Sequence, residues 1–322
     1  MNSSDSFPSR GAMPVCILLS VHNGATFLAD QLRSLVQQTH QDWALIWRDD
    51  GSTDDSARIV QHFADTQPVG RCVQITRITE RLGVARSFAL LLDQVPDGHL
   101  AAFCDQDDVW FPDKLERAAQ ALLPLHATGR PALYCSRQVL TDAALARLGL
   151  SPLLPSAPTF SMALAQNIAT GCTITLSPAA IRLVRAAMPP PARTLHDWWS
   201  YLLVSGADGQ VVTDNRPSLY YRQHQSNAVG APAHVAARAL AAFRRGPGPF
   251  MSAFSTNVAQ LLCHADLLSD RNTATLTTLQ QALAIRGPAG WLARFRVLRR
   301  LPGLRRGTRA EQMVFRSWFL LG

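Results

Sequence analysis

The stretch HLAAFCDQDDVWFPDKL (residues 99–115) joins an apolar run, a cluster of acids and a helix start. The apolar part, HLAAFC (99–104), is typical of a buried strand. Pro112 favours the first turn of a helix, which we expect to continue to Leu122. Directly after the strand come three acids: Asp105, Asp107 and Asp108. Because like charges at this spacing repel one another and are costly to desolvate, they lie either on a solvated loop or beside a positive partner.

The same alternation of strand and helix patterns runs through roughly the first 140 residues. Further strand-like apolar runs occupy 14–21, 43–48, 71–76 and 132–136. Helical spacing of apolar residues between them indicates βαβ units, and so an α/β fold with a mainly parallel central sheet flanked by helices. Later in the chain we expect a strand at 171–177, helices at 178–187 and 196–206, and strands at 210–213 and 218–223.

Polar clusters follow three of the predicted strands, at residues 20–23, 49–52 and 105–108. Ligands bind beyond the carboxyl ends of the strands in parallel sheets, so we expect these three loops to meet in one cleft. In the second loop, Ser52 or Thr53 is placed to cap the helix that follows.

The spacing of the acids after residue 104 suits a hard cation. Carboxylates spaced D-x-D at a strand end can hold Mg²⁺ or Mn²⁺, while a neighbour accepts a hydrogen bond from a sugar hydroxyl. A calcium loop of the EF-hand type is excluded, because Val109 and Trp110 stand where an oxygen ligand and a glycine are needed. The alternative is a solvated acidic loop, for which the aromatic neighbours Trp110 and Phe111 are unusual.

Composition limits the class of protein. A chain of 322 residues that is 47% hydrophobic and 17% charged can bury a sizeable core. Residues 1–12 are polar and lack the apolar region of a signal peptide, so we interpret them as a loose leader. No run of about 20 residues is apolar enough to span a bilayer, which favours a cytoplasmic protein. The cysteines form no C-x-x-C pair, which favours buried free thiols over a zinc site.

Positive charge is concentrated near the C-terminus. Residues 230–322 contain 13 Arg, no Lys, two Asp and one Glu, a net charge of +10, whereas residues 1–229 carry a net charge of −2. We therefore expect a globular domain at 13–229 and a helical, Arg-rich region at 230–322. This asymmetry indicates an anionic partner for the C-terminal region.

One segment of that region has an amphipathic pattern. In WLARFRVLRRL (291–301) one helical side carries apolar residues and another carries arginines. The apolar residues are Trp291, Phe295 and Leu298, and the arginines are Arg296, Arg299 and Arg300. This pattern fits a helix that lies on an anionic membrane surface. A solvated helical cap is the alternative; nucleic acid is disfavoured, because the sequence contains no nucleic-acid-binding motif.

Six motifs in a fixed order carry a family resemblance: SVHNG, WRDDGSTDDS, ERLGVARSF, FCDQDDVWFPDKL, HDWW and LYYRQHQSNAVG. Together they resemble the family-two nucleotide-sugar glycosyltransferases with the GT-A fold, and most of all their bacterial rhamnosyltransferase-like branch. The resemblance covers about residues 13–230. It implies an inverting, metal-dependent transferase that moves a sugar, with rhamnose as a candidate, from a dTDP- or UDP-sugar to a hydroxyl of a cell-surface glycan or lipid-linked acceptor. The protein would work in the cytoplasm or at the inner face of the plasma membrane.

The resemblance also implies roles for individual residues. The nucleotide would be bound by Ser20, His22, Asn23, Asp50 (base) and Asp105 (ribose). The metal, Mg²⁺ or Mn²⁺, would be held by Asp107 and His224. Asp197 would be the catalytic base that deprotonates the acceptor. Contacts to the donor or acceptor sugar are expected from Arg81, Asp108, His196, Trp198 and Trp199. Arg81 and Ser87 stand where the family often has an amide side chain, so the resemblance leaves the donor-sugar contacts open.

Several of these residues could instead have purely structural roles. Asp197 could simply cap a helix, the tryptophan pair could belong to the core, and His224 could be an ordinary loop histidine. Two other functions are also open. A sugar-phosphate nucleotidyltransferase would need a Gly-rich basic loop after the first strand, which residues 21–24 lack. A non-enzymatic basic adaptor that binds membrane or nucleic acid is disfavoured by the intact set of acids.

Overall fold

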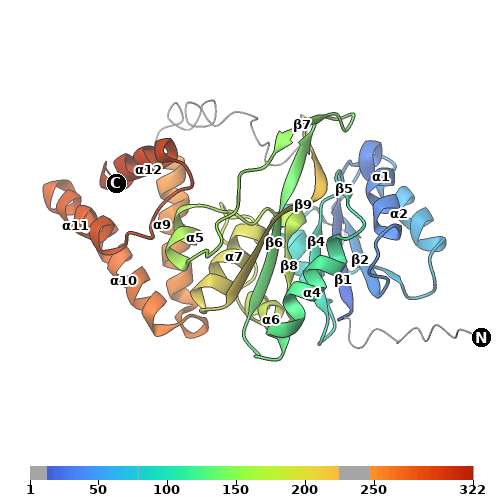
Figure 1. Ribbon diagram of the computed structural model, residues 1–322, viewed down its shortest axis with the longest axis horizontal. Helices are drawn as coiled ribbons and strands as arrows, with labels where there is room; N and C mark the ends of the chain where they lie inside the picture. Colours follow the sequence, from blue (N-terminus) through green and yellow to red (C-terminus); the bar gives the residue numbers. More distant parts are fainter. Residues whose placement is uncertain (1–12, 79, 225–246, 322) are drawn as a thin grey trace, which may run out of the picture.

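A nine-stranded sheet forms the centre of the protein, in the order β3-β2-β1-β4-β8-β6-β9-β5, with β7 paired to β6 (Figure 1). The computed structural model describes residues 13–78, 80–224 and 247–321. The strands are β1 (Val15–Val21), β2 (Trp43–Asp49), β3 (Cys72–Gln74), β4 (Leu100–Cys104), β5 (Val109–Trp110), β6 (Ala132–Thr141), β7 (Arg147–Leu150), β8 (Thr175–Leu176) and β9 (Gln210–Arg222).

The long strands share one direction. β1 pairs in parallel with β2 and β4, and β2 pairs in parallel with β3. β8 is antiparallel to both β4 and β6, so β6 runs the same way as β4, and β9 is parallel to β6. Only the short β5, β7 and β8 oppose this direction among the described strands. The expectation of a mainly parallel sheet flanked by helices is confirmed.

Helices cover both faces of the sheet, as parallel strands require. They are α1 (Ala25–Val36), α2 (Ser56–Asp65), α3 (Val84–Leu92), α4 (Lys114–His126), α5 (Phe160–Ala165), α6 (Pro178–Ala186) and α7 (His196–Gly206). Successive side chains of a strand point to opposite faces. In β1, Ile17 and Leu19 pack with α1, α2 and α4, whereas Leu18 packs with α3, α6 and α7. The two cores therefore lie on either side of β1.

Three predicted elements differ from the structure. Residues 171–177 form a 3₁₀ turn (Gly171–Thr173) and the two-residue β8, where we expected one strand. The strands expected at 210–213 and 218–223 are one strand, β9, whose pairing with β6 shifts register near Pro217. Proline cannot donate to a ladder, and a register shift accommodates it. Helix α4 begins at Lys114, after Pro112 rather than at it.

Helices α9 (Pro247–Cys263), α10 (Asp270–Ala284), α11 (Gly287–Arg300) and α12 (Arg309–Leu321) form the C-terminal region. They lie at the end of the molecule opposite α1 and α2 (Figure 1). Phe254 of α9 and Phe319 of α12 are buried in the same apolar cluster as Trp199 of α7. Among the described residues, no helix is both long and apolar enough to cross a membrane.

Candidate active site

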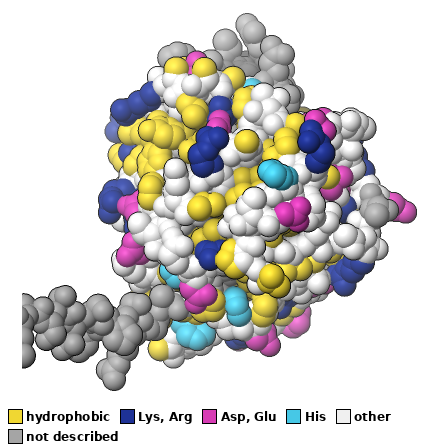
Figure 2. Space-filling model, turned by 90° about the vertical axis from the view of Figure 1, so that its right-hand side faces the viewer, with side chains coloured by type: hydrophobic (Ala, Val, Ile, Leu, Met, Phe, Trp, Pro, Cys, Tyr) yellow, Lys and Arg dark blue, Asp and Glu magenta, His cyan; other side chains and the backbone are white. Residues whose placement is uncertain are grey.

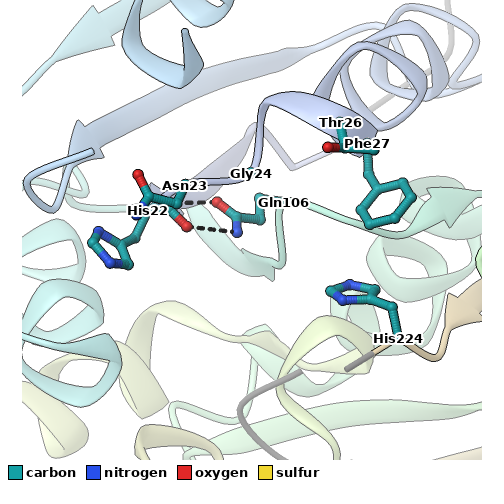
Figure 3. A pocket seen from close by; sticks show the side chains of 7 residues that line it. All are labelled: His22, Asn23, Gly24, Thr26, Phe27, Gln106 and His224. Atoms are coloured by element: carbon teal, nitrogen blue, oxygen red, sulfur yellow. Dashed lines mark hydrogen bonds between the residues drawn. The ribbon is translucent and has the colours of Figure 1, made fainter. Parts of the chain in front are cut away.

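A cavity of about 330 Å³ opens at the carboxyl end of β1. Its walls come from the β1–α1 turn, from the loop after β4 and from the end of β9, as Figure 3 shows. The lining residues are His22, Asn23, Gly24, Thr26, Phe27, Gln106 and His224. Two of the three loops expected to meet here, 20–23 and 105–108, therefore lie side by side.

Gln106 joins these two loops. Its side-chain Oε1 accepts a hydrogen bond from the His22 backbone N–H at 2.8 Å, and its Nε2 donates to the His22 carbonyl at 3.0 Å (Figure 3). A Cβ on Gly24 would lie 2.3 Å from the Gln106 side chain, so a larger residue at position 24 would have to displace Gln106. The role of Gln106 was not predicted from the sequence, because its neighbours Asp105, Asp107 and Asp108 are the residues with metal-binding chemistry.

Asn23 ties the β1–α1 turn to the loop after β2. Its backbone N–H donates to Ser52 Oγ at 3.1 Å, and its Oδ1 accepts from the Thr53 N–H at 2.8 Å. The prediction that Ser52 or Thr53 caps α2 is wrong, because the N-cap residue is Asp55. The two hydroxyl residues hold the turn at 20–23 instead. All three predicted loops therefore meet at this edge of the sheet.

Asp50 is a buried anchor in the second loop. Its two carboxylate oxygens accept from the backbone N–H groups of Leu82 and Gly83 at 2.6 and 2.8 Å. The guanidinium of Arg48, itself fully buried, lies 3.2 Å away. Asp50 thus orders the segment that presents Arg81, an exposed side chain beside Gly51. Its expected contact to a base stays a prediction.

Asp107 and His224 meet at the rim of the cavity. Asp107 Oδ2 and His224 Nε2 are 2.8 Å apart, and each side chain retains some exposure, 16% and 14%. The imidazole also packs against Phe27, with ring centroids 4.7 Å apart, and these rings face each other in Figure 3. The carboxylate oxygen and the imidazole nitrogen are close enough to share one cation. The two expected metal ligands, 117 residues apart in the chain, are therefore brought together.

Asp105 and Asp108 lie deeper, beside Cys172. Ligand atoms of these three side chains lie within 4.8 Å of one another. Burial, followed by the charges of Asp107 and Asp197, raises the pKa of Asp105 to about 7. Asp108 is fully buried, and burial raises its pKa well above the usual range. Its burial makes it unsuited to touching a sugar directly, so ordering the loop is the role that its position favours.

A buried cation lies beneath this acidic loop. The Lys114 side chain is fully buried, 4.6 Å from the centre of the Trp110 ring. Its Nζ has no hydrogen-bond partner within the described residues. Burial lowers the pKa of Lys114 to about 8, and the neighbouring Cys172, Cys104 and Asp108 partly offset that shift. Lys114 thus supplies part of the positive charge that the acid cluster needs.

Asp197, in the first turn of α7, is held by three donors. Its Oδ2 accepts from Asn167 Nδ2 at 3.0 Å and from the Gly171 N–H at 3.2 Å, and its Oδ1 accepts from the Trp198 N–H at 2.6 Å. Burial raises the pKa of Asp197 to about 6, although these hydrogen bonds oppose that shift. Its charge also acts on Asp105. A fixed carboxyl with a pKa near neutrality suits a general base.

The neighbours of Asp197 are mostly buried. The His196 ring stacks on Phe88, with centroids 4.0 Å apart, and burial lowers its pKa to about 3. Neither ring nitrogen finds a hydrogen-bond partner in the described part of the chain. Trp199 is 1% exposed and donates its indole N–H to the Ala187 carbonyl. Trp198 is half-buried, packs against the apolar core and donates its indole N–H to the Ala163 carbonyl at 2.8 Å.

The sequence of this region matches a known family. Residues 16–129 match the model described as Glycosyl transferase family 2. This part of the chain is a family 2 glycosyltransferase domain. The matched region contains β1 to β4, the acids from Asp105 to Asp108 and every cavity-lining residue except His224, whereas Asp197 and His224 come from later elements.

Curated relatives agree with this assignment. The glycosyltransferase is 25% identical over 226 residues to the dTDP-rhamnosyl transferase RfbG of Shigella flexneri, covering 66% of this chain and 74% of that protein. It is 29% identical over 110 residues to the UDP-Glc:alpha-D-GlcNAc-diphosphoundecaprenol beta-1,3-glucosyltransferase WfgD of Escherichia coli. That match covers 34% of this chain and 41% of WfgD.

Solved structures show the fold. S. aureus TarS (residues 1–349, in complex with UDP-GlcNAc) superposes with a TM-score of 0.59 at 13% identity, covering 91% of this chain and 84% of that one. The mannosyltransferase PcManGT from Pyrobaculum calidifontis, in complex with GDP-Man and Mn²⁺, gives a TM-score of 0.52 at 17% identity, covering 97% and 86%. The glycosyltransferase therefore has the GT-A fold that its sequence motifs predicted.

Proposed function

We propose that this glycosyltransferase transfers a sugar, with inversion, from a nucleoside-diphosphate sugar to a hydroxyl of a growing cell-surface glycan or a lipid-linked acceptor. The observation that carries the proposal is the environment of Asp197. Its buried carboxyl is held by hydrogen bonds from Asn167 and Gly171 and has a pKa of about 6. Its charge acts on Asp105. The proposed base, Asp197, thus lies near Asp105, which follows the carboxyl end of β4, and parallel sheets bind ligands at that end of their strands.

Asp197 would remove the proton of the acceptor hydroxyl. As that oxygen attacks the anomeric carbon, the bond to the diphosphate breaks on the opposite face, and the sugar is inverted. The proton moves to Asp197 Oδ1 or Oδ2. Because the pKa of Asp197 is raised to about 6 by burial, the carboxylate is a stronger base than an exposed aspartate and is still mostly ionised at neutral pH.

Asp107 and His224 would hold the Mg²⁺ or Mn²⁺ ion that the family resemblance implies. Their 2.8 Å contact at the rim of the cavity fits this role, since one oxygen and one nitrogen ligand already converge there. When bound, a divalent cation neutralises the charge that develops on the departing diphosphate. Asp105, with Ser20, His22, Asn23 and Asp50, stays the proposed nucleotide-binding set.

The donor is proposed to be a dTDP- or UDP-sugar, with rhamnose as the candidate sugar. The support is the similarity to a relative named as a dTDP-rhamnosyl transferase and to one named as using UDP-Glc. Arg81 and the half-buried Trp198 are the side chains from which we expect contacts to the donor or acceptor sugar. The reaction is proposed to take place in the cytoplasm or at the inner face of the plasma membrane.

The test is a donor panel. The full chain is incubated with Mn²⁺ or Mg²⁺ and a series of dTDP-, UDP- and GDP-sugars, and nucleotide release and donor binding are followed. We expect metal-dependent binding and slow hydrolysis of one dTDP- or UDP-sugar. Asp197→Asn should bind that donor as the native chain does and fail to transfer it. The proposal is wrong if no donor binds in the presence of either metal.

A further inference from the structure

Helix α11 carries an apolar surface that nothing in the described chain covers. Trp291, Leu292 and Phe295 are 45%, 42% and 38% exposed. The Trp291 and Phe295 rings stack on each other, with centroids 5.4 Å apart and planes 7° from parallel. Because the rings pack in parallel at the surface, they form one flat apolar patch rather than isolated exposed residues.

The opposite side of α11 faces the protein. Gly290, Arg294 and Val297 are buried, and Val297 belongs to the apolar core of the C-terminal helices. Arg294 donates to the backbone carbonyls of Ile285 and Leu320, so it is a structural residue. These contacts fix which side of α11 points outward. Leu298, which the sequence pattern placed with Trp291 and Phe295, is half-buried and packs on the core instead.

Exposed arginines lie on the same helix as this patch. Arg296, Arg299 and Arg300 are all exposed on the same helix. No acid occurs anywhere between Asp270 and Glu311, a segment that contains nine arginines. At the other end of the molecule, over α1 and α2, Figure 2 shows basic and acidic side chains mixed. The excess of positive charge is therefore in the C-terminal region, which also carries the apolar patch.

We propose that α11 docks the enzyme onto an anionic lipid bilayer, with Trp291, Leu292 and Phe295 in the boundary between headgroups and acyl chains. Arg296, Arg299 and Arg300 contact the lipid phosphates. A helix with aromatic residues beside arginines, and with no acids nearby, has the composition of an interfacial helix. Each arginine near an anionic surface strengthens binding about fivefold. The chemistry favours lipid over nucleic acid, because apolar side chains gain from leaving water in a bilayer but find no partner along a phosphate backbone.

The experiment is co-sedimentation of the full chain with vesicles of phosphatidylcholine alone or with 30–40% phosphatidylglycerol, roughly the range that makes a surface strongly anionic. We expect binding to the anionic vesicles only, weakened as salt is raised. Two variants test the two halves of the proposal: Trp291→Ser/Phe295→Ser and Arg296→Gln/Arg299→Gln/Arg300→Gln. The arginine variant should bind about 100-fold more weakly, since three contacts are lost. All five side chains are exposed, so folding should be retained.

Matched controls remove the same kinds of group elsewhere. Arg33→Gln/Arg58→Gln/Arg216→Gln removes three exposed arginines, and Val69→Ser/Leu153→Ser removes two exposed apolar side chains. Both controls should bind vesicles as the native chain does. Quenching by brominated acyl chains gives a second readout: the quenched fluorescence should fall in Trp291→Phe, because that indole enters the bilayer.

Several outcomes would overturn the proposal. One is equal binding of the native chain to neutral and anionic vesicles, and another is undiminished binding of both helix variants. A native dimer that Trp291→Ser/Phe295→Ser dissociates, without vesicle binding, would make the patch a subunit interface. Tighter binding to a DNA or RNA oligonucleotide, lost only in the arginine variant, would reassign the surface to nucleic acid. Vesicle binding needs neither donor nor acceptor, so its failure is separate from failure of the proposed transferase activity.

Discussion

The side-chain amide of Asn167 donates to Oδ2 of Asp197 at 3.0 Å, and this bond favours the ionised form of the Asp197 carboxyl. We predict that Asn167→Ala raises the pKa of Asp197 above its value of about 6, because one donor to the carboxylate is lost. In the native enzyme the transfer rate should rise with pH through about 6, as Asp197 loses its proton. In the variant that rise should move upward by about 1 pH unit. The measurement is the pH profile of kcat/KM.

A control separates this effect from misfolding. The N–H groups of Gly171 and Trp198 still hold Asp197 in the variant, so the rate well above the new pKa should recover to within about tenfold of the native rate. Asn167→Asp adds a like charge and should move the profile further in the same direction. An unmoved profile in both variants would show that Asp197 is not the group whose ionisation controls the rate.

The contact of Gly24 with Gln106 leads to a packing prediction. A Cβ at position 24 would lie 2.3 Å from the Gln106 side chain, so Gly24→Ala must displace Gln106 and break its hydrogen bonds to His22. We expect a loss of about 1–3 kcal/mol in the free energy of unfolding, measured by urea denaturation, and weaker donor binding. Gly149→Ala is the control, because its added Cβ meets nothing within 4 Å.

A double-mutant cycle shows whether Gln106 is the cause. Gln106→Ala removes the obstructing side chain, so Gly24→Ala should cost little stability in that background, and the two changes should be strongly non-additive. Additive losses would mean that another contact limits position 24.

The pair formed by Asp107 and His224 predicts a metal dependence. We expect Asp107→Ala and His224→Ala each to weaken Mn²⁺ binding at least tenfold, because each removes one of two converging ligands. The measurement is calorimetry or electron paramagnetic resonance of Mn²⁺ with the full chain and a nucleoside diphosphate. Asp113→Ala, an exposed acid in the following helix cap, should leave binding unchanged. Unaltered Mn²⁺ affinity in both ligand variants would remove this pair from the metal site.

The sequence predicts where polar residues gather in the fold better than it predicts the contacts that hold them there. Apolar runs and polar clusters predicted β1, β2 and β4 and the meeting of their loops, since strand ends are set by local pattern. Gln106 and Lys114 escaped notice because their roles depend on partners distant in the chain, His22 and the buried space beneath Asp108. Such contacts arise only when the sheet is assembled, and no spacing rule predicts them.

The sequence alone also did not decide whether Trp199 is buried. A tryptophan beside Asp197 is compatible with both a sugar platform and a core residue, and the rotation of α7 against the sheet decides which side chain is buried. It buries Trp199 completely and leaves Trp198 half-buried against the apolar core. In the C-terminal region, Leu298 packs against the core. The helical pattern alone did not distinguish it from its exposed neighbours Trp291 and Phe295.

The buried carboxyl of Asp105 should make the free energy of unfolding depend on pH. Its pKa is about 7 in the folded chain, well above the usual value of about 4, because of burial and of the charges on Asp107 and Asp197. Between about pH 4 and 7 the folded state therefore holds a proton that the unfolded state has lost, and this contribution to stability falls as the pH rises. Above pH 7 the folded chain carries the full cost of ionising Asp105.

Asparagine at this position cannot ionise, so Asp105→Asn should be more stable than the native chain at pH 8, by on the order of 2 kcal/mol, and nearly equal at pH 4. The measurement is urea unfolding at both pH values with a chelator present, since a bound cation would neutralise the same charges. Asp97→Asn, in an exposed loop, should show no such pH-dependent difference. The same Asp105→Asn change should weaken donor binding if Asp105 contacts the ribose. Equal stability of the variant and the native chain at pH 8 would show that the carboxylate of Asp105 is already balanced by a positive neighbour such as Lys114.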